Sequence, residues 1–189
     1  MHKMPLVKLD PDLSVLAIID IQPVLTKTIH EAERVLDRVA FLAKVARLLG
    51  VPVLTTEQNP SRMGATHPSL TELVQDPPAF SKMTFSAAEC QSFMDGLKAT
   101  GRKQVVVVGM ETHICVGQTA QDLLERGYEV VVCPDAVSSR TMERHKLGME
   151  RIRDAGVIPA HTESVAYEWL KSADSPEFRS ALAIVKQHP

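Results

Sequence analysis

The 189-residue sequence has few aromatic side chains and no surplus of positive charge. Phe, Trp and Tyr make up 4% of the chain, and the formal net charge is -2. Proteins that bind nucleic acids hold the phosphates with basic patches and stack the bases on aromatic rings. The composition therefore predicts no nucleic-acid partner.

Long hydrophobic runs and paired cysteines are also missing. The charged, proline-containing N-terminal stretch precedes only a short apolar run, without a signal-peptide cleavage site or the roughly 20 apolar residues of a membrane span. Cys90, Cys115 and Cys133 are odd in number and lack the spacing of a disulfide framework. We therefore expect a cytoplasmic protein with no membrane partner.

The sequence contains none of the common phosphate-binding or zinc-binding motifs. Neither G-x-G-x-x-G nor G-x-x-x-x-G-K-[ST] occurs, which disfavours a nucleotide-binding role. No H-x-H, D-x-H or C-x-x-C pair is present to start a zinc site. We expect no cofactor and no metal, with His67 and His113 at the surface or lining a pocket.

What the chain does contain is the balance of a globular protein, with 44% hydrophobic and 23% charged residues. Its length fits one domain. Short runs rich in Val and Ile, apolar on both faces, predict buried parallel strands. These runs are residues 15–20, 51–55, 104–109, 129–133 and 157–160.

Segments with helical periodicity lie between these runs. Residues 31–49, 113–126 and 141–155 each end at a glycine, the residue typical of a helix C-terminus. Residues 164–170 and 176–186 predict two short helices that cover an edge of the sheet or meet a neighbouring subunit. The alternation predicts a Rossmann-like α/β fold, an open, mostly parallel six-stranded sheet with helices on both faces.

One stretch, residues 57–81, does not follow this alternation. It predicts a helix only around residues 69–74, and a loop of this length inside a compact domain is typically a lid or pocket wall. Its turn-forming residues are Pro60, Gly64, Pro68, Pro77 and Pro78.

Ligands of open α/β sheets bind at the carboxyl ends of the strands, which points to three segments of this chain. Asp20 ends the first strand, residues 56–59 follow the second, and residues 109–115 lead from a later strand to Cys115. Cys115 lies just after a predicted helix start, where the backbone amides and the helix dipole favour a thiolate and an oxyanion. The alternative is a small buried thiol, which suits Cys90 and Cys133 better.

The sequence allows two interpretations each for Asp20 and Lys82. Asp20 is either a partly desolvated carboxylate that exchanges a proton with a nucleophile or an Asp that caps a turn. Lys82, between two phenylalanines, either extends to solvent or points into the pocket and stabilises both a thiolate and Asp20.

Several segments resemble those of isochorismatase-like cysteine hydrolases. Residues 109–116 with 119–130 and 134–136 resemble the family's nucleophile segment, and residues 18–22 are similar to its opening D-x-Q pattern. Residues 55–64 and 80–86 are similar to the subgroup of isochorismatase domain-containing proteins. The resemblance covers nearly the whole chain and implies one hydrolase domain over residues 1–189.

The resemblance implies a catalytic triad of Asp20, Lys82 and Cys115. It also implies a cis peptide between Met110 and Glu111, with the N–H groups of Glu111 and Cys115 forming an oxyanion hole. A retained cysteine favours cleavage of a C–N bond in a small amide or carbamoyl compound through a thioester.

The resemblance also marks where this chain departs from the nicotinamidases of the family. They have a zinc-binding D-x-H where this chain has Glu57, Gln58 and Asn59, so a metal-independent enzyme is implied. Gln22, Glu57, Asn59 and Phe85 are the candidate substrate-binding residues.

The family resemblance further implies a homo-oligomer, with the C-terminal helices as contacts. Two other functions stay open. One is a ligand-binding or protein-interaction module with little or no turnover, and the other is a redox-sensing thiol, which usually needs a resolving cysteine.

Overall fold

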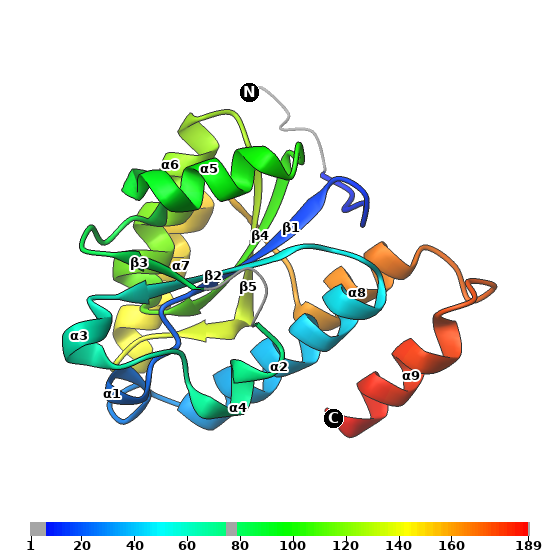
Figure 1. Cartoon of the computed structure of the whole chain (residues 1–189), viewed down its shortest axis with the longest axis horizontal. Coiled ribbons are helices and arrows are strands. Elements are labelled where there is room, and N and C mark those ends of the chain that lie inside the picture. The colour runs from blue at the N-terminus through cyan, green and yellow to red at the C-terminus, as the bar shows by residue number, and fades with distance from the viewer. Residues whose placement is uncertain (1–6, 75–78, 189) are drawn as a thin grey trace.

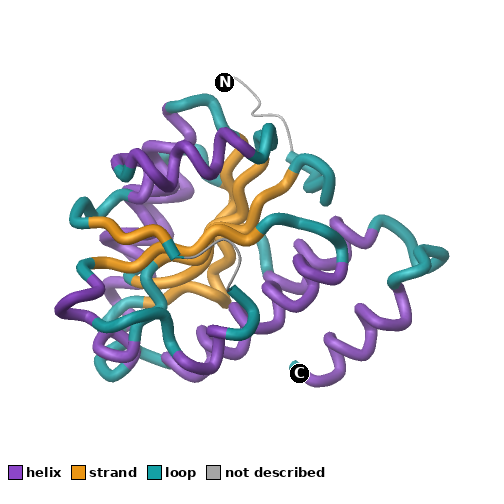
Figure 2. Tube along the Cα trace, viewed as in Figure 1, coloured by secondary structure: helices purple, strands orange, loops and turns teal. Residues whose placement is uncertain are grey.

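The computed structural model describes residues 7–74 and 79–188, in which a parallel sheet separates two layers of helices (Figures 1 and 2). The sheet has six strands in the order β3-β2-β1-β4-β5-β6, and all five pairings are parallel. The strands are β1 (Ser14–Ile19), β2 (Val53–Gln58), β3 (Phe80–Lys82), β4 (Gln104–Met110), β5 (Glu129–Ser138) and β6 (Ile158–Pro159).

The helices alternate with the strands along the chain. They are α1 (Pro23–Thr26), α2 (Ala32–Leu48), α3 (Pro60–Met63), α4 (Pro68–Thr71), the 3₁₀ helix η1 (Ala87–Glu89), α5 (Gln91–Ala99), the π-helix η2 (Thr112–Val116), α6 (Gly117–Glu125), α7 (Met142–Asp154), α8 (Thr162–Leu170) and α9 (Phe178–Gln187). None of these helices has the length and apolarity needed to cross a membrane.

The strands alternate their side chains between two hydrophobic cores. In β1, Leu16 and Ile18 pack into the core formed with α2 and α8. Val15, Ala17 and Ile19 pack into the other core, with α5, α6 and α7. Figure 1 shows α5, α6 and α7 on one side of the sheet and α2 and α8 on the other. A strand buried on both faces is apolar at every position, which explains the continuous Val and Ile runs.

The predicted fold class is confirmed, with differences at the ends of the elements. The sixth strand is β3, at the edge of the sheet next to β2. Its three residues are too few to give a periodic signal, so sequence reasoning assigned no strand there. Strand β5 continues beyond the predicted residue 133 to Ser138, across a register shift in its pairing with β4.

The C-terminal helices do not cover an edge of the sheet. Both α8 and α9 pack against α2, and α9 lies outermost in Figure 1. His188, which follows α9, is held between Nζ of Lys44 at 2.9 Å and Oδ1 of Asp37 at 2.6 Å. The first of the two predicted placements, at an edge of the sheet, is therefore wrong, because α2 supplies the partner for these helices. The second, a contact with a neighbouring subunit, stays a prediction.

The predicted loop of residues 57–81 contains more structure than expected, including α3, α4 and the start of β3. It is tied to the end of β1, because the His67 N–H donates to the Ile21 carbonyl at 2.7 Å. Pro77 and Pro78 of this predicted pocket wall lie outside the described residues.

Candidate active site

The centre of the site is an ion pair between Asp20 and Lys82. Asp20 directly follows β1, Lys82 ends β3, and Nζ of Lys82 lies 2.6 Å from Oδ2 of Asp20. Both side chains have 0% exposure. Lys82 therefore points into the protein, and the alternative of a lysine extending to solvent is wrong.

Neighbouring groups satisfy the remaining polar atoms of this pair. Thr56 donates to Oδ1 of Asp20 at 2.7 Å, while Lys82 donates to Oε1 of Gln58 at 2.7 Å and to the Phe85 carbonyl at 3.0 Å. A buried charge pair is tolerated when its lone pairs and protons have partners in this way. The arrangement fixes the carboxylate and the ammonium in one geometry.

Thr56 and Gln58 are contacts that sequence reasoning missed. Side chains alternate along a strand, so Thr56 and Gln58 share one face of β2 and Glu57 lies on the other. This alternation was the available signal in the sequence, and the structure adds the register, in which Thr56 pairs with Ile19 and Gln58 pairs with Lys82.

Cys115 lies in η2, directly after β4, with 7% of its surface exposed. Burial raises the pKa of the Cys115 thiol to about 12, and the charge of Asp20 and the hydrogen bond to it act in the same direction. The ammonium of Lys82 opposes this shift. The predicted preference for a thiolate is therefore wrong for the resting site, because burial outweighs the effect of the helix start.

The Glu111 backbone begins the turn that carries Cys115. The Met110–Glu111 peptide bond is cis. The Glu111 carbonyl then accepts from the N–H of Ile114 at 3.0 Å and from that of Val116 at 3.2 Å. This widened turn is a π-helix, a local form found frequently at functional sites.

Three of the candidate binding residues use their side chains to build the wall of the site. Gln22 donates to the carbonyls of Gln58 and Gly64 and accepts from the Gln58 N–H at 2.8 Å. The carboxylate of Glu57 accepts from the N–H of Thr66 at 2.6 Å and from its hydroxyl at 2.8 Å. The Asn59 side chain accepts from Ser61. In this structure these side chains hold the segment after β2 in place.

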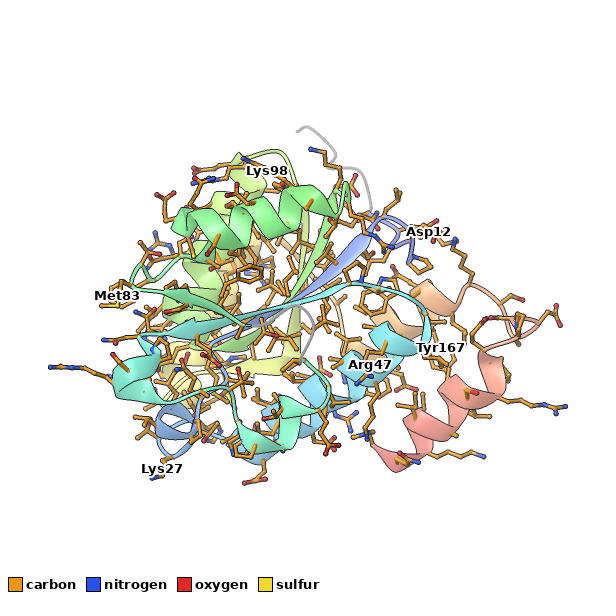
Figure 3. All side chains as sticks on the ribbon, viewed as in Figure 1. Asp12, Lys27, Arg47, Met83, Lys98 and Tyr167 are labelled. Atoms are coloured by element: carbon orange, nitrogen blue, oxygen red, sulfur yellow. The ribbon has the colours of Figure 1, made fainter. Side chains whose placement is uncertain are left out.

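Phe85, the fourth candidate, has a side chain open to solvent. Phe85 is 55% exposed and Met83 is 71% exposed, although Lys82, the last residue of β3, is buried. Figure 3 labels Met83 at one side of the molecule, far from Asp12, which precedes β1. The carboxyl ends of the strands therefore carry an apolar rim next to Lys82.

One histidine lies in η2 and a second lies beside it in α7. Burial lowers the pKa of both His113 and His145. Nδ1 of His113 lies 2.9 Å from Oγ of Ser139, and Nδ1 of His145 lies 3.0 Å from Oγ1 of Thr112. Among residues 7–74 and 79–188, no group of three or more His, Cys, Asp or Glu side chains is arranged to hold a metal ion.

The fold and the residues at the carboxyl ends of its strands define a Rossmann-like α/β protein with the fold of a hydrolase. The chain belongs to the isochorismatase family, because residues 14–164 match the family model described as the isochorismatase domain.

Individual relatives agree with this assignment. The chain is 36% identical to the secreted isochorismatase effector Isc1 of Phytophthora sojae, covering 96% of this chain and 88% of that protein. It is 35% identical to isochorismatase domain-containing protein 2A of Mus musculus, over 94% of this chain and 84% of the mouse protein. The predicted resemblance to isochorismatase domain-containing proteins is thus confirmed.

A solved structure from Caenorhabditis elegans has the same fold. It is described as a MAR1 ribonuclease and superposes with a TM-score of 0.91 at 32% sequence identity, covering 97% of this chain and 95% of that one.

Proposed function

We propose that the protein is a metal-independent cysteine hydrolase that cleaves a C–N bond of a small amide or carbamoyl compound. The observation that carries this proposal is the contact of the Cys115 thiol with a buried Asp20 that is paired to Lys82 at 2.6 Å. A thiol, a base within hydrogen-bonding reach and a group that orients the base are the parts of an activated nucleophile.

In the first step, Asp20 takes the proton of Cys115 while the sulfur attacks the carbonyl carbon of the substrate. The high pKa of the resting thiol means that this proton leaves as the C–S bond forms. The carbonyl oxygen then carries the negative charge. The N–H groups of Glu111 and Cys115 are the proposed donors to this oxyanion.

In the second step, the C–N bond breaks and Asp20 returns the proton to the leaving nitrogen, which departs as ammonia or an amine. The thioester is then attacked by water, whose proton passes to Asp20 and from there to the departing sulfur of Cys115. Lys82 stays protonated throughout and balances the charge of Asp20. The cycle consumes one water and leaves the free thiol.

The substrate enters past the apolar rim. Phe85 is the proposed contact for an apolar part of the substrate because it is exposed beside Lys82. Gln22, Glu57 and Asn59 contribute to binding through the shape of the wall that they hold. Because Phe85 is the proposed substrate contact and Gln22 holds the wall in place, we expect replacing Phe85 to change substrate preference and replacing Gln22 to alter the local fold.

The test is ammonia release from a panel of small amides and ureido compounds. We expect release with the wild-type protein and with Cys90→Ala, and none above background with Cys115→Ala. Release from no member of the panel, with ligand binding still detected by calorimetry, would favour a binding module. Equal release from Cys115→Ala would overturn the proposed nucleophile.

Three expectations about the surroundings of the enzyme stay predictions. They are a cytoplasmic location, a homo-oligomer whose subunit is a single domain of residues 1–189, and the absence of a nucleic-acid partner. A net charge of -2 with 4% aromatic residues supports the last of these. Light scattering of the purified protein checks the oligomer, and incubation with labelled RNA checks for ribonuclease activity.

A further inference from the structure

A second carboxylate, that of Glu111, lies close to the nucleophile and is not used in the proposed reaction. Its side chain is 10% exposed, and its charge adds to the effects that raise the pKa of Cys115. A buried negative charge next to a thiol opposes loss of the thiol proton. The proposed reaction therefore proceeds best when this charge is neutralised.

Arg140 is placed to neutralise this charge. Met110 pairs with Ser138 in the sheet, so the chain after β5 runs beside the chain after β4. The backbone N–H and Nε of Arg140 both donate to Oε2 of Glu111, each at 3.1 Å. The Arg140 side chain is 48% exposed, and within the described ranges it makes no other hydrogen bond. Its contact with the protein is thus directed at Glu111.

We propose that Arg140 is a positioning residue that acts through Glu111, holding and neutralising this carboxylate so that Cys115 can pass its proton to Asp20. The inference rests on the proposed role of Cys115 as nucleophile. Arg140 does not touch the reacting atoms, and its contribution is modest because a half-exposed ion pair is screened by solvent.

Other charged groups face Cys115 from the neighbouring elements. Asp20 after β1 opposes ionisation of the thiol and Lys82 in β3 favours it. His113 in η2 and His145 in α7 are neutral near pH 7 because burial lowers their pKa. The first turn of α6 carries no acidic residue. None of these groups is hydrogen-bonded to Glu111 among the described residues, but the charges of Glu111, Arg140 and Arg144 all act on His113. The effect of Arg140 on Cys115 therefore has to be isolated by variants of Glu111 and Arg144.

The experiment is a double-mutant cycle read by alkylation of Cys115. The rate of iodoacetamide labelling at pH 8 is followed by mass spectrometry on the full chain, with Cys90 labelling as the internal reference. We expect Arg140→Gln to slow Cys115 labelling by about threefold and Arg140→Lys to restore part of the rate. Glu111→Gln speeds labelling, and adding Arg140→Gln to Glu111→Gln has no further effect.

Arg144→Gln is the matched control, because Arg144 is an exposed arginine of α7 whose side chain makes no hydrogen bond with the described residues. It should leave the labelling ratio unchanged. A slowing by Arg140→Gln of the same size in the Glu111→Gln background, or no slowing at all, would overturn the inference. Arg140→Lys keeps the test available if Arg140→Gln does not fold.

This readout separates the inference from the proposed function. Labelling of Cys115 needs no substrate. If no compound of the ammonia-release panel is turned over, the hydrolase proposal fails, but the double-mutant cycle can still be measured. Where turnover is found, Arg140→Gln should lower kcat with KM nearly unchanged and steepen the dependence of kcat on rising pH. A loss confined to KM would indicate a direct substrate contact and would count against a positioning role.

Discussion

At the scale of single residues, the site combines a thiol that stays protonated with a carboxylate that stays paired. The pKa of Cys115 is raised to about 12 by burial and by Asp20, while Lys82 lies 2.6 Å from Asp20. A thiolate is therefore scarce before substrate binds. The proposed reaction therefore depends on proton transfer within the pair of Cys115 and Asp20, and it does not need a stored thiolate.

This arrangement predicts opposite effects of Asp20→Asn on turnover and on labelling. Turnover should fall about 10²–10⁴-fold because the base is removed. Alkylation of Cys115 at pH 8 should become faster, since a charge that raises its pKa is gone and Lys82 remains. Thr56→Val is the matched control, because it removes one hydrogen bond to Asp20 and keeps the carboxylate. Slower alkylation in Asp20→Asn would contradict this account.

The same ion pair predicts a stability effect of Lys82→Met. This change leaves the Asp20 carboxylate buried without its cation, which should cost about 3–5 kcal/mol in the free energy of unfolding. Adding Asp20→Asn should recover part of the loss, because the uncompensated charge is then removed. Urea denaturation of the two variants measures both changes. A double variant that is less stable than Lys82→Met alone would show that the pair is not coupled in this way.

Sequence reasoning located the catalytic candidates but not the groups that hold them. Asp20 and Cys115 follow strands, so their position at one edge of the sheet could be inferred from the strand pattern. The contacts of Thr56, Gln58 and Arg140 depend on the register between strands that are distant in the sequence. Glu57 and Asn59 were predicted as binding residues alongside the family resemblance, whereas alternation along β2 directs Thr56 and Gln58 to the ion pair.

At the scale of elements, the close approach of β1 and β4 positions Asp20 beside Cys115. Gly109 in β4 pairs with Ile19, the residue before Asp20, and has a φ of 123°. A Cβ at this position would lie 2.1 Å from the Ile19 carbonyl oxygen. The backbone of β4 therefore needs glycine here, both for its dihedral angles and for its contact with β1.

We expect Gly109→Ala to lose about 3 kcal/mol or more of unfolding free energy, because backbone strain and a backbone clash add together. Gly101→Ala is the matched control. Gly101 also has a positive φ, 68°, but nothing lies within 4 Å of its added Cβ, so only about 1–2 kcal/mol should be lost. Chemical denaturation of both variants checks the difference. Equal losses would show that the contact with Ile19 carries no cost.

The main helices and strands were predictable because each has a local signal. Helices α2, α6 and α7 combine an apolar face with a glycine after the last turn. The short elements α3 and β3 have no such signal. They are fixed by contacts with distant residues, such as the bonds from Gln22 to the segment after β2 and the pairing of Gln58 with Lys82.

At the scale of the whole molecule, the two layers place most titratable groups at the surface and a few inside. His113 and His145 are partly buried beside the candidate active site, and burial lowers the pKa of each. The pKa of Asp37 is also lowered, because hydrogen bonds from His188 and Arg38 outweigh the effect of burial. These groups link the stability of the fold to pH in two separate ranges.

The histidines determine the first range. In the folded state their pKa lies below the unfolded value of about 6.5, so the unfolded chain binds protons first as the pH falls. Their stabilising contribution is present above about pH 6.5 and is lost as the pH falls through the lower folded pKa. Asp37 follows the same sign at lower pH, below its unfolded value of about 3.9.

We therefore expect the melting temperature to fall between pH 7.5 and 5.5, and to fall again below about pH 4. His145→Gln should flatten the first decrease, because glutamine can replace the hydrogen bond to Thr112 without titrating. His67→Gln is the matched control, since His67 caps the short helix α4 at the surface and should leave the decrease unchanged. Thermal denaturation at both pH values measures the slopes. An unchanged slope in His145→Gln would assign the pH dependence to His113 or to groups outside this layer.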